Sequence, residues 1–261
     1  MNLNKITDLF YNEGLIINGN NKKLSVIDKE LIIKKFKRHG LVIFRNFDHE
    51  IKKLANFTNI YTSRYANDAT RRKKRLDSNI IKNVDLGNQK IDLHSEASFS
   101  ISCPEIIWFG CIKPSKSSGG RTILCDGIKL WDALSIKTKK FFLENQIKYK
   151  LKINWSNPMP GKGKREWFME TPGVSNVVLN LNDGTLDLDY FTFAIKKKRE
   201  LDKLAFANHL LINLDSEPQI LSRTTNKDKL IPKKILAEVH KKSKKLTFKF
   251  DWKKNDILMI D

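Results

Sequence analysis

The chain reads GLVIFRNF over Gly40–Phe47, and this stretch decides how its N-terminal part is expected to fold. The four consecutive apolar residues from Leu41 to Phe44 predict a short buried strand. The preceding stretch, Asp28–Arg38, carries apolar residues near helical spacing and stops at Gly40, a residue type that commonly ends helices. A helix that leads into a buried strand is therefore predicted here.

Further elements follow from the same pattern rules. Asp48 is placed to cap a second helix that carries apolar residues on one face. Later helices are predicted from Ser135 through Phe142 and over Pro232–Lys245. Strand character is predicted over Ile91–Ile101, Glu105–Cys111, Arg121–Cys125, Val177–Phe193, Leu246–Phe250 and Ile257–Ile260. Helices at the front and a mostly β body predict an α+β fold built around a jelly-roll sheet.

Length and composition narrow the class of protein. The 261 residues are 40% hydrophobic and 30% charged, which suits one globular domain and excludes a collagen-like or wholly disordered chain. No apolar run approaches the roughly 18 residues of a membrane span, and no signal peptide is recognised, so we expect no membrane association. Three cysteines without C-x-x-C spacing predict free thiols and a cytoplasmic location.

The formal net charge of +20 comes from 39 lysines and 10 arginines against 29 acidic residues. Nucleic-acid readers favour arginine, and the basic clusters lack the interleaved aromatic residues of a single-strand platform. These clusters are Arg71–Arg75, Lys196–Arg199 and Lys241–Lys245. Solvated surface is the favoured interpretation, and a patch for an acidic partner is the alternative.

His94-Ser95-Glu96 is the one place where a histidine of this chain has a carboxylate two residues on. In a strand, residues i and i+2 point to the same face, so the imidazole and the carboxylate are expected to converge. A histidine, a carboxylate and a second histidine on one face of Fe(II) form the site of non-haem iron oxygenases. The alternative is a hydrogen-bonded structural pair, because such a short motif also arises by chance.

The surroundings of this motif resemble the Fe(II)/2-oxoglutarate-dependent oxygenases of the taurine dioxygenase and clavaminate synthase superfamily. Five segments match motifs of that family in the family's order. They are Gly40–Phe47 for an N-terminal strand, His94–Glu96 for the H-x-[DE] metal motif, Pro104–Cys111 for the next strand, Gly119–Thr122 for the GG-x-T turn and Trp252–Asp261 for the W-x-x-G-D motif, with Asn255 where glycine is usual. The resemblance spans nearly the whole chain.

The resemblance implies a double-stranded β-helix, a distorted jelly roll with flanking helices, as a single TauD/TfdA-type domain over residues 1–261. It implies Fe(II) and 2-oxoglutarate as cofactors, with His94 and Glu96 as metal ligands and Thr122 as a contact of 2-oxoglutarate. An ordinary strand residue is the alternative for Thr122. Its neighbour Arg121 is left out, because adjacent strand residues point to opposite faces.

One departure from the family pattern concerns the end of the motif series. In the family, the last segment runs into the distal metal histidine and then into the arginine that pairs with 2-oxoglutarate. Neither occurs before Asp261, so the domain is expected to be C-terminally incomplete and can lack its last strands. His209 and His240 lie upstream of that segment and are not expected to replace the missing ligand.

The function expected from the resemblance is hydroxylation or desaturation of a small anionic or amino-acid-like substrate, which can be tethered to a carrier. Arg71–Arg75 falls in a predicted lid, Ser63–Lys90, and suggests an acidic substrate or an acidic carrier protein as partner. A second loop, Asn154–Gly173, is expected to face the pocket with Trp155, Trp167 and Phe168, for which core packing is the alternative. The rival functions are a non-catalytic family member without a full iron site and, less favoured, a basic nucleic-acid-binding protein.

Overall fold

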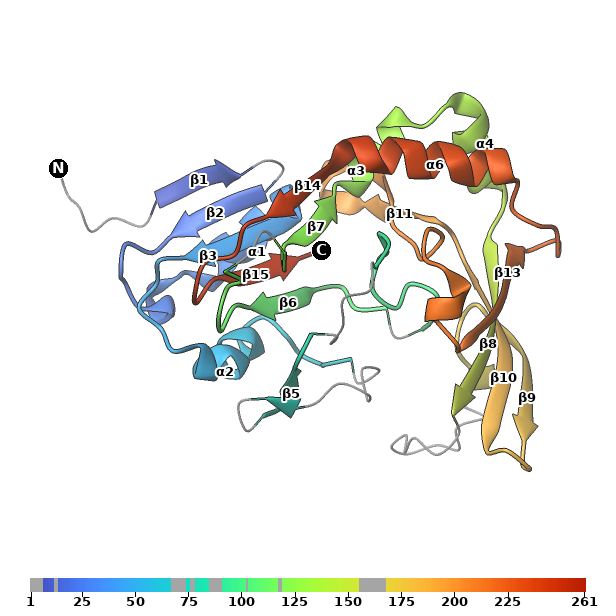
Figure 1. Cartoon of the computed structure of the whole chain (residues 1–261), viewed down its shortest axis with the longest axis horizontal. Helices are drawn as coiled ribbons and strands as arrows, with labels where there is room; N and C mark the ends of the chain where they lie inside the picture. The colour runs from blue at the N-terminus through green and yellow to red at the C-terminus, as the bar shows by residue number, and fades with distance from the viewer. Residues whose placement is uncertain are drawn as a thin grey trace. The chain divides into compact units, whose positions relative to one another are not determined.

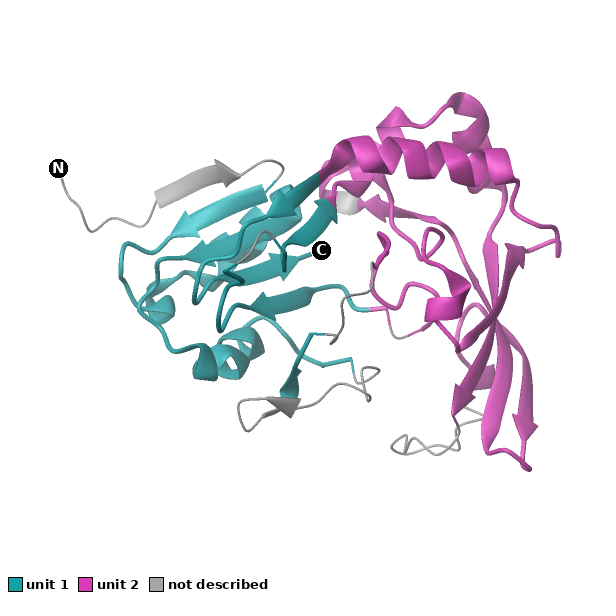
Figure 2. Cartoon of the chain, in the orientation of Figure 1, with its two compact units in different colours: residues 1–89, 104–124, 248–261 teal, residues 90–103, 125–247 magenta. Residues whose placement is uncertain are grey.

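The computed structural model describes residues 7–11, 14–66, 74–75, 78–84, 91–101, 103–116, 119–154 and 168–261. The chain divides into two compact units, which Figure 2 shows in different colours. Unit 1 comprises residues 1–89, 104–124 and 248–261, and unit 2 comprises residues 90–103 and 125–247. The single domain expected over residues 1–261 stays a prediction.

Unit 1 is built on a five-stranded sheet with the order β1-β2-β3-β15-β6 (Figure 1). Its strands are β1 (Thr7–Tyr11), β2 (Gly14–Asn18), β3 (Leu41–Arg45), β15 (Ile257–Ile260) and β6 (Ile107–Gly110). Strands β2 and β3 are parallel, and the other neighbours are antiparallel. The chain crosses between β2 and β3 through helix α1 (Lys29–His39), as a parallel pair requires.

Helix α1 and strand β3 confirm the prediction from the opening stretch. The Asp28 side chain accepts a hydrogen bond from the backbone N–H of Leu31 at 2.8 Å and so caps the helix. Gly40 ends it with φ 69°, a left-handed conformation that glycine adopts without steric cost. All five residues of β3 are buried, as a central strand covered on both faces should be.

The two faces of the unit 1 sheet pack into separate hydrophobic clusters. Val42 and Phe44 of β3 join Ile257 of β15 in one cluster, while Ile43 and Leu258 belong to the other. All five side chains are fully buried. Because neighbouring residues of a strand point to opposite faces, the continuous apolar runs of both strands supply both clusters.

A buried ion pair closes the end of this sheet. The guanidinium of Arg45 donates to both carboxylate oxygens of Asp256, with Nε–Oδ1 at 2.9 Å. The Asp256 side chain is 1% exposed and that of Arg45 is 11% exposed. Asp256 also accepts the backbone N–H of Lys253 at 2.7 Å, so one carboxylate fixes both the end of β3 and the turn before β15.

Two predictions made from the sequence, a helix cap at Asp48 and a strand over Ile91–Ile101, are wrong. Asp48 does not cap a helix, because its backbone N–H bonds to the Lys22 carbonyl at 2.8 Å and it forms a bridge with Lys23. A 3-10 turn precedes helix α2 (Leu54–Asn59), whose N-cap residue Lys53 makes no side-chain cap. Ile91–Ile101 contains no strand over its described residues, since irregular backbone leads into a turn from residue 96.

Unit 2 contains a four-stranded antiparallel sheet with the order β13-β8-β10-β9 (Figure 1). Its core includes Tyr149, Leu186 and Leu188 from the sheet, together with Phe142 and Val239 from the helices. The strands and helices of this unit are β8 (Ile147–Asn154), β9 (Val174–Asn180), β10 (Thr185–Thr192), β13 (Ile220–Thr225), the hairpin of β11 (Ile195–Lys198) and β12 (Lys203–Phe206), α3 (Gly127–Ala133), α4 (Ile136–Glu144) and α6 (Lys233–Leu246). The mixture of helices and strands confirms the α+β expectation.

Both later helices begin close to where the sequence predicts them. Ser135 caps α4 by accepting the Thr138 N–H, and α6 covers the predicted Pro232–Lys245 segment with a shift of one residue. The basic cluster Lys241–Lys245 lies on α6, where Ser243 is buried and Lys241, Lys244 and Lys245 are exposed. This placement agrees with the interpretation of that cluster as solvated surface.

The remaining strands form two-stranded sheets. Strand β7 (Thr122–Cys125) pairs with β14 (Thr247–Phe250), and the chain passes from one unit to the other within each of them. Strands β4 (Lys74–Arg75) and β5 (Ser78–Lys82) form the other pair. The predicted strands Arg121–Cys125, Leu246–Phe250 and Ile257–Ile260 are thus confirmed within a residue or two.

Glu238 of α6 ties this helix to the start of α4, and its replacement gives a test of the unit 2 packing. Its carboxylate accepts hydrogen bonds from the Ser135 N–H at 2.7 Å and the Thr138 hydroxyl at 2.6 Å. Burial alone would raise the pKa of Glu238, but these hydrogen bonds and the Lys242 charge lower it. A carboxylate with a lowered pKa stabilises the fold above its unfolded pKa and loses that effect as the pH falls through the folded value.

We therefore expect Glu238→Gln to lower the free energy of unfolding by about 0.5–1 kcal/mol at pH 7, a small effect because water screens this partly exposed group. The difference from the wild type should shrink as the pH falls below the ordinary glutamate pKa of about 4.3 and vanish once the pH lies below the lowered pKa of the folded state. Urea unfolding at a series of pH values measures it. A difference that is independent of pH would contradict the assigned role of the charge.

Candidate metal centre in unit 2

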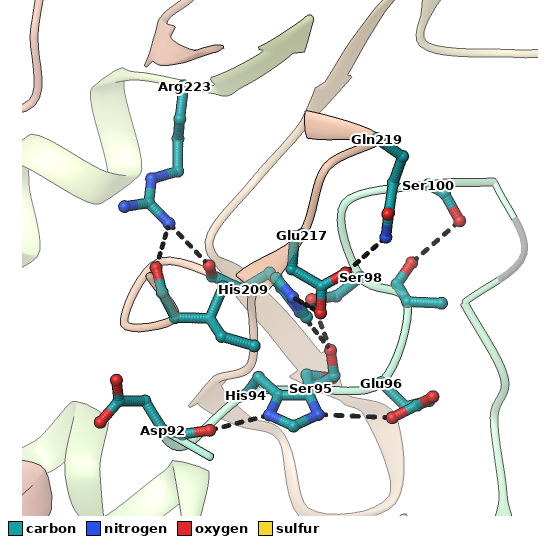
Figure 3. Close-up of polar contacts among 12 residues, drawn as sticks. Asp92, His94, Ser95, Glu96, Ser98, Ser100, His209, Glu217, Gln219 and Arg223 are labelled. Atoms are coloured by element: carbon teal, nitrogen blue, oxygen red, sulfur yellow. Dashed lines mark hydrogen bonds and ion pairs between the residues drawn. The ribbon is translucent and has the colours of Figure 1, made fainter. Parts of the chain in front are cut away.

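His94 and Glu96 meet, although not by the route that the sequence suggested. The structure places both at the start of unit 2, where a turn replaces the expected strand. The turn is closed by Ser98, whose N–H and hydroxyl both donate to the Ser95 carbonyl, and Ala97 adopts a left-handed φ of 47°. It leaves His94 Nε2 and Glu96 Oε2 3.4 Å apart (Figure 3).

The environment of His94 determines which ring nitrogen is available. Nδ1 lies 2.8 Å from the backbone oxygen of Asp92, which can only accept, so Nδ1 carries the hydrogen. In the neutral ring the lone pair then lies on Nε2, the atom that faces Glu96. A metal-binding histidine usually donates the N–H of its other ring nitrogen to a carbonyl, a carboxylate or water, and this bond orients the ring. The Asp92 carbonyl is such a partner for His94.

The spacing of the two groups suits a shared cation. Nitrogen and carboxylate ligands lie about 2.1 Å from a first-row metal ion, so two neighbouring ligands are about 3.0–3.4 Å apart. Both side chains are partly accessible, at 25% and 31% exposure. His94 and Glu96 therefore fit as two ligands of one metal ion, and imidazole with carboxylate suits Fe(II).

The surroundings of His94 favour a positive charge at this position. Burial alone would lower the pKa of His94, but the hydrogen bonds to Glu96 and Asp92 and the charges of Glu96 and Glu217 raise it above its ordinary value. Glu217 has a lowered pKa, first because of its hydrogen bond with His209. The pair is thus an anionic environment that attracts a cation.

His209 lies against this pair but does not complete it. Its ring is 2% exposed and packs edge-on against the ring of His94, with the centroids 5.0 Å apart. Nδ1 lies 3.3 Å from the Ser95 carbonyl and Nε2 lies 3.3 Å from Glu217 Oε1, so neither nitrogen is turned toward Glu96 (Figure 3). Within the described ranges, no group of three histidine, cysteine, aspartate or glutamate side chains could hold a metal ion. The expectation that His209 and His240 are not the missing ligand stays a prediction.

Thr122 lies in unit 1, on strand β7. Its hydroxyl oxygen accepts a hydrogen bond from the indole N–H of Trp252 at 3.1 Å, which leaves the Thr122 O–H to donate elsewhere. Arg121 pairs with Asp251 at 2.5 Å, as an outward-facing neighbour can. The predicted contact of Thr122 with 2-oxoglutarate stays a prediction.

Several other candidates fall partly or wholly outside the described residues. These are most of Arg71–Arg75, parts of the Ser63–Lys90 lid, and Trp155 and Trp167 in the Asn154–Gly173 loop. Phe168, at the end of the undescribed part of that loop, is 4% exposed and belongs to the unit 2 core. The core alternative is therefore the correct one for Phe168.

Two residues that orient the pair leave no recognisable signal in the sequence. Asp92 acts through its backbone carbonyl, which no residue pattern reveals. Glu217 comes 121 positions after Glu96 in the chain, in an irregular segment without periodicity. Only the fold brings it to His209.

Comparison with known proteins identifies the family of the chain. The family model described as taurine catabolism dioxygenase TauD, TfdA family matches residues 3–261. The chain belongs to the TauD, TfdA family. The resemblance inferred from the five sequence motifs is thereby confirmed, and with it the enzyme class and cofactors of the family: a 2-oxoglutarate-dependent dioxygenase that uses Fe(II).

Solved structures support this TauD-type fold at low sequence identity. AAD-2 in complex with Mn(II) and N-oxalylglycine matches with a TM-score of 0.59 and 13% identity, over 98% of this chain and 87% of that one. PvcB from Pseudomonas aeruginosa matches with a TM-score of 0.58 and 11% identity, over 95% and 77% of the two chains. A further PvcB structure, described as an Fe, alpha-ketoglutarate dependent oxygenase from an isonitrile synthetic pathway, has a TM-score of 0.57 and 10% identity.

No curated protein sequence matches this TauD-family chain significantly. Among the helices that the structure describes, none combines the length and the apolar character that a membrane span requires.

Proposed function

We propose that this chain is a dioxygenase in which His94 and Glu96 are two of the Fe(II) ligands and Thr122 contacts 2-oxoglutarate, within a double-stranded β-helix. The observation that carries the proposal is the pair itself: Asp92 directs the Nε2 lone pair of His94 toward a carboxylate oxygen 3.4 Å away. A ring nitrogen and a carboxylate oxygen at this distance can share one cation, either a proton or a metal ion. The family of the chain supplies the identity of that cation.

The residues of the chain have distinct tasks in this proposal. When bound, Fe(II) would activate O2 with 2-oxoglutarate as the co-reductant, and O2 would supply the oxidising power that removes a hydrogen from the substrate. His94 holds the metal through Nε2 while Asp92 keeps Nδ1 protonated, and Glu96 adds the negative charge. Because Glu96 occupies a ligand position, hydroxylation or desaturation is favoured. Thr122, already held by Trp252, has its O–H free to donate to a carboxylate oxygen of 2-oxoglutarate.

The proposed substrate is a small anionic or amino-acid-like molecule, either free or tethered to a carrier. The formal net charge of +20 favours acidic molecules near the surface and attracts them more strongly at low salt. An acidic carrier protein is one partner that this charge would attract.

A non-catalytic role is the second candidate function. It is favoured by the finding that the described residues hold no group of three side chains able to bind a metal. Two protein ligands alone hold Fe(II) weakly, so the test must distinguish a site that is weak from one that is absent.

An anaerobic titration with Fe(II) and 2-oxoglutarate tests the proposal, with the metal-to-ligand charge-transfer absorbance as the readout. We expect the band in the wild type and its loss in His94→Ala and Glu96→Ala, while His240→Gln on α6 serves as the matched control and keeps it. The same titration is run on a chain extended by the codons that follow Asp261. A band in the extended chain alone supports the enzyme with a third ligand from that segment, and no band in either chain supports the non-catalytic role.

A further inference from the structure

Ser95 lies between the two proposed ligands, and both its backbone N–H and its backbone carbonyl are hydrogen-bonded. The Ser95 N–H donates to the Asn208 carbonyl at 3.0 Å. The Ser95 carbonyl accepts from His209 Nδ1 at 3.3 Å as well as from the Ser98 hydroxyl at 2.9 Å. Because Ser95 joins His94 to Glu96, these bonds fix the two peptide planes from which both side chains start.

The His209 ring cannot turn without losing several contacts at once. Glu217 engages Nε2 at 3.3 Å, and Gln219 donates in turn to Glu217. The ring of Phe99 packs edge-on against it with the centroids 4.7 Å apart, and the side chain is 2% exposed. A polar ring that is buried in this way must keep its hydrogen bonds, since breaking them costs the full desolvation of its nitrogens.

The loop that carries His209 is itself anchored to the strands of unit 2. The Asn208 side-chain amide donates to the Ala194 carbonyl at 2.9 Å, and its oxygen accepts the Leu210 N–H at 2.8 Å. Arg223 of β13 donates to the His209 carbonyl at 2.9 Å and to the Ile212 carbonyl at 3.2 Å (Figure 3). A continuous series of hydrogen bonds thus runs from β13 through His209 to Ser95.

We propose that His209 is a positioning residue that holds the His94–Glu96 pair in its metal-binding arrangement through the Ser95 carbonyl. This inference rests on the proposed function of that pair. His209 supports the site without entering it, because both of its ring nitrogens are engaged by Ser95 and Glu217. Partners that orient metal ligands in this way typically contribute 10- to 100-fold to metal affinity.

Two substitutions, each of which keeps an amide nitrogen near the place of one ring nitrogen, separate this role from a general contribution to folding. In His209→Asn the side-chain amide lies near the former Nδ1, so it can still donate to the Ser95 carbonyl. In His209→Gln the amide lies near the former Nε2, so it can reach Glu217 but not Ser95. Both variants leave a smaller polar group in the same cavity, and only one of them keeps the bond that the proposal requires.

The measurement is Mn(II) affinity, from the electron paramagnetic resonance signal of free Mn(II), on full-length protein shown to be folded by circular dichroism. We expect His209→Gln to weaken binding roughly 10- to 100-fold and His209→Asn to stay within about threefold of the wild type. Equal loss in both variants, or no loss in either, would overturn the proposal. If neither variant folds, Glu217→Ala takes their place, and it should weaken binding about threefold to tenfold because the ring loses its second anchor; unchanged affinity there would equally overturn it.

Failure of the underlying site gives a different result. His94→Ala is measured beside the wild type, and equal Mn(II) binding by these two proteins would reject the proposed ligand pair itself. Binding that requires His94 but is indifferent to His209 would reject only the positioning role. His240→Gln controls for the removal of a histidine elsewhere in unit 2.

Discussion

Replacement of Asp256 with alanine is expected to lower the free energy of unfolding by about 3–5 kcal/mol. The Asp256 carboxylate is 1% exposed and accepts two hydrogen bonds from Arg45 and one from the Lys253 N–H. Its loss leaves the Arg45 guanidinium largely buried without a counter-charge. An unpaired buried charge costs more than the pair contributes, so the effect of the single substitution should be large.

Urea unfolding followed by tryptophan fluorescence measures this loss. Asp251→Asn is the matched control, because Asp251 pairs with Arg121 at the surface with a side chain that is 66% exposed, and it should cost less than about 1 kcal/mol. The double variant Arg45→Met with Asp256→Ala removes both charges and should recover more than half of the loss. A single variant within about 1 kcal/mol of the wild type would show that the pair is not buried in solution.

The second large effect is expected for Phe44→Ala, with a loss of about 3–5 kcal/mol. Phe44 is fully buried on β3 and contacts three aromatic rings. The ring centroids lie 5.0 Å from Phe57 in an edge-on arrangement, 6.4 Å from Phe47 and 6.4 Å from Trp108. The substitution opens a cavity among these rings, which the closely packed sheet cannot fill by small movements.

The same unfolding assay measures this variant against two controls. Leu31→Ala removes an aliphatic side chain that is 50% exposed on α1 and should cost less than about 1 kcal/mol. Phe44→Leu keeps most of the volume and should cost markedly less than the alanine variant. Equal effects of Phe44→Ala and Leu31→Ala would contradict the burial of this ring.

The sequence predicts those elements of the fold whose signals are local. Asp28 and Gly40 bracket α1 because each acts on backbone groups within four residues of itself. The apolar run of β3 and the run of β15 identify central strands, because only strands covered on both faces are continuously apolar. Helix α6 is found from the periodicity of Ile235, Leu236 and Val239.

The failures arise where a tertiary contact outweighs a local preference. Asp48 is a suitable helix cap, but its backbone is engaged with Lys22 and Lys23, so the helix begins later. The side chains of His94 and Glu96 converge as expected, but through a turn at Ala97 and not through a shared strand face. The two side chains do meet, but the turn brings them together and the alternation of residues along a strand does not.

The residues around the candidate site could not be predicted from the sequence, for a similar reason. His209 and Ser95 are 114 positions apart, and Glu217 joins them only because the loop after β12 is pinned by Asn208 and Arg223. A short motif can indicate the ligands of a metal, but the groups that orient those ligands come from distant segments. Their identity depends on packing, which leaves no periodic pattern in the chain.

The position of β15 within its sheet has a consequence for synthesis on the ribosome. Residues 257–260 form the strand between β3 and β6, whereas β2 and β3 are completed by residue 45. The edge of β3 that pairs with β15 therefore stays without its partner strand while more than 200 further residues are synthesised, including all of unit 2. Until then Val42, Ile43 and Phe44 form an apolar strand with an open edge, the kind of surface that binds chaperones or other unfinished chains.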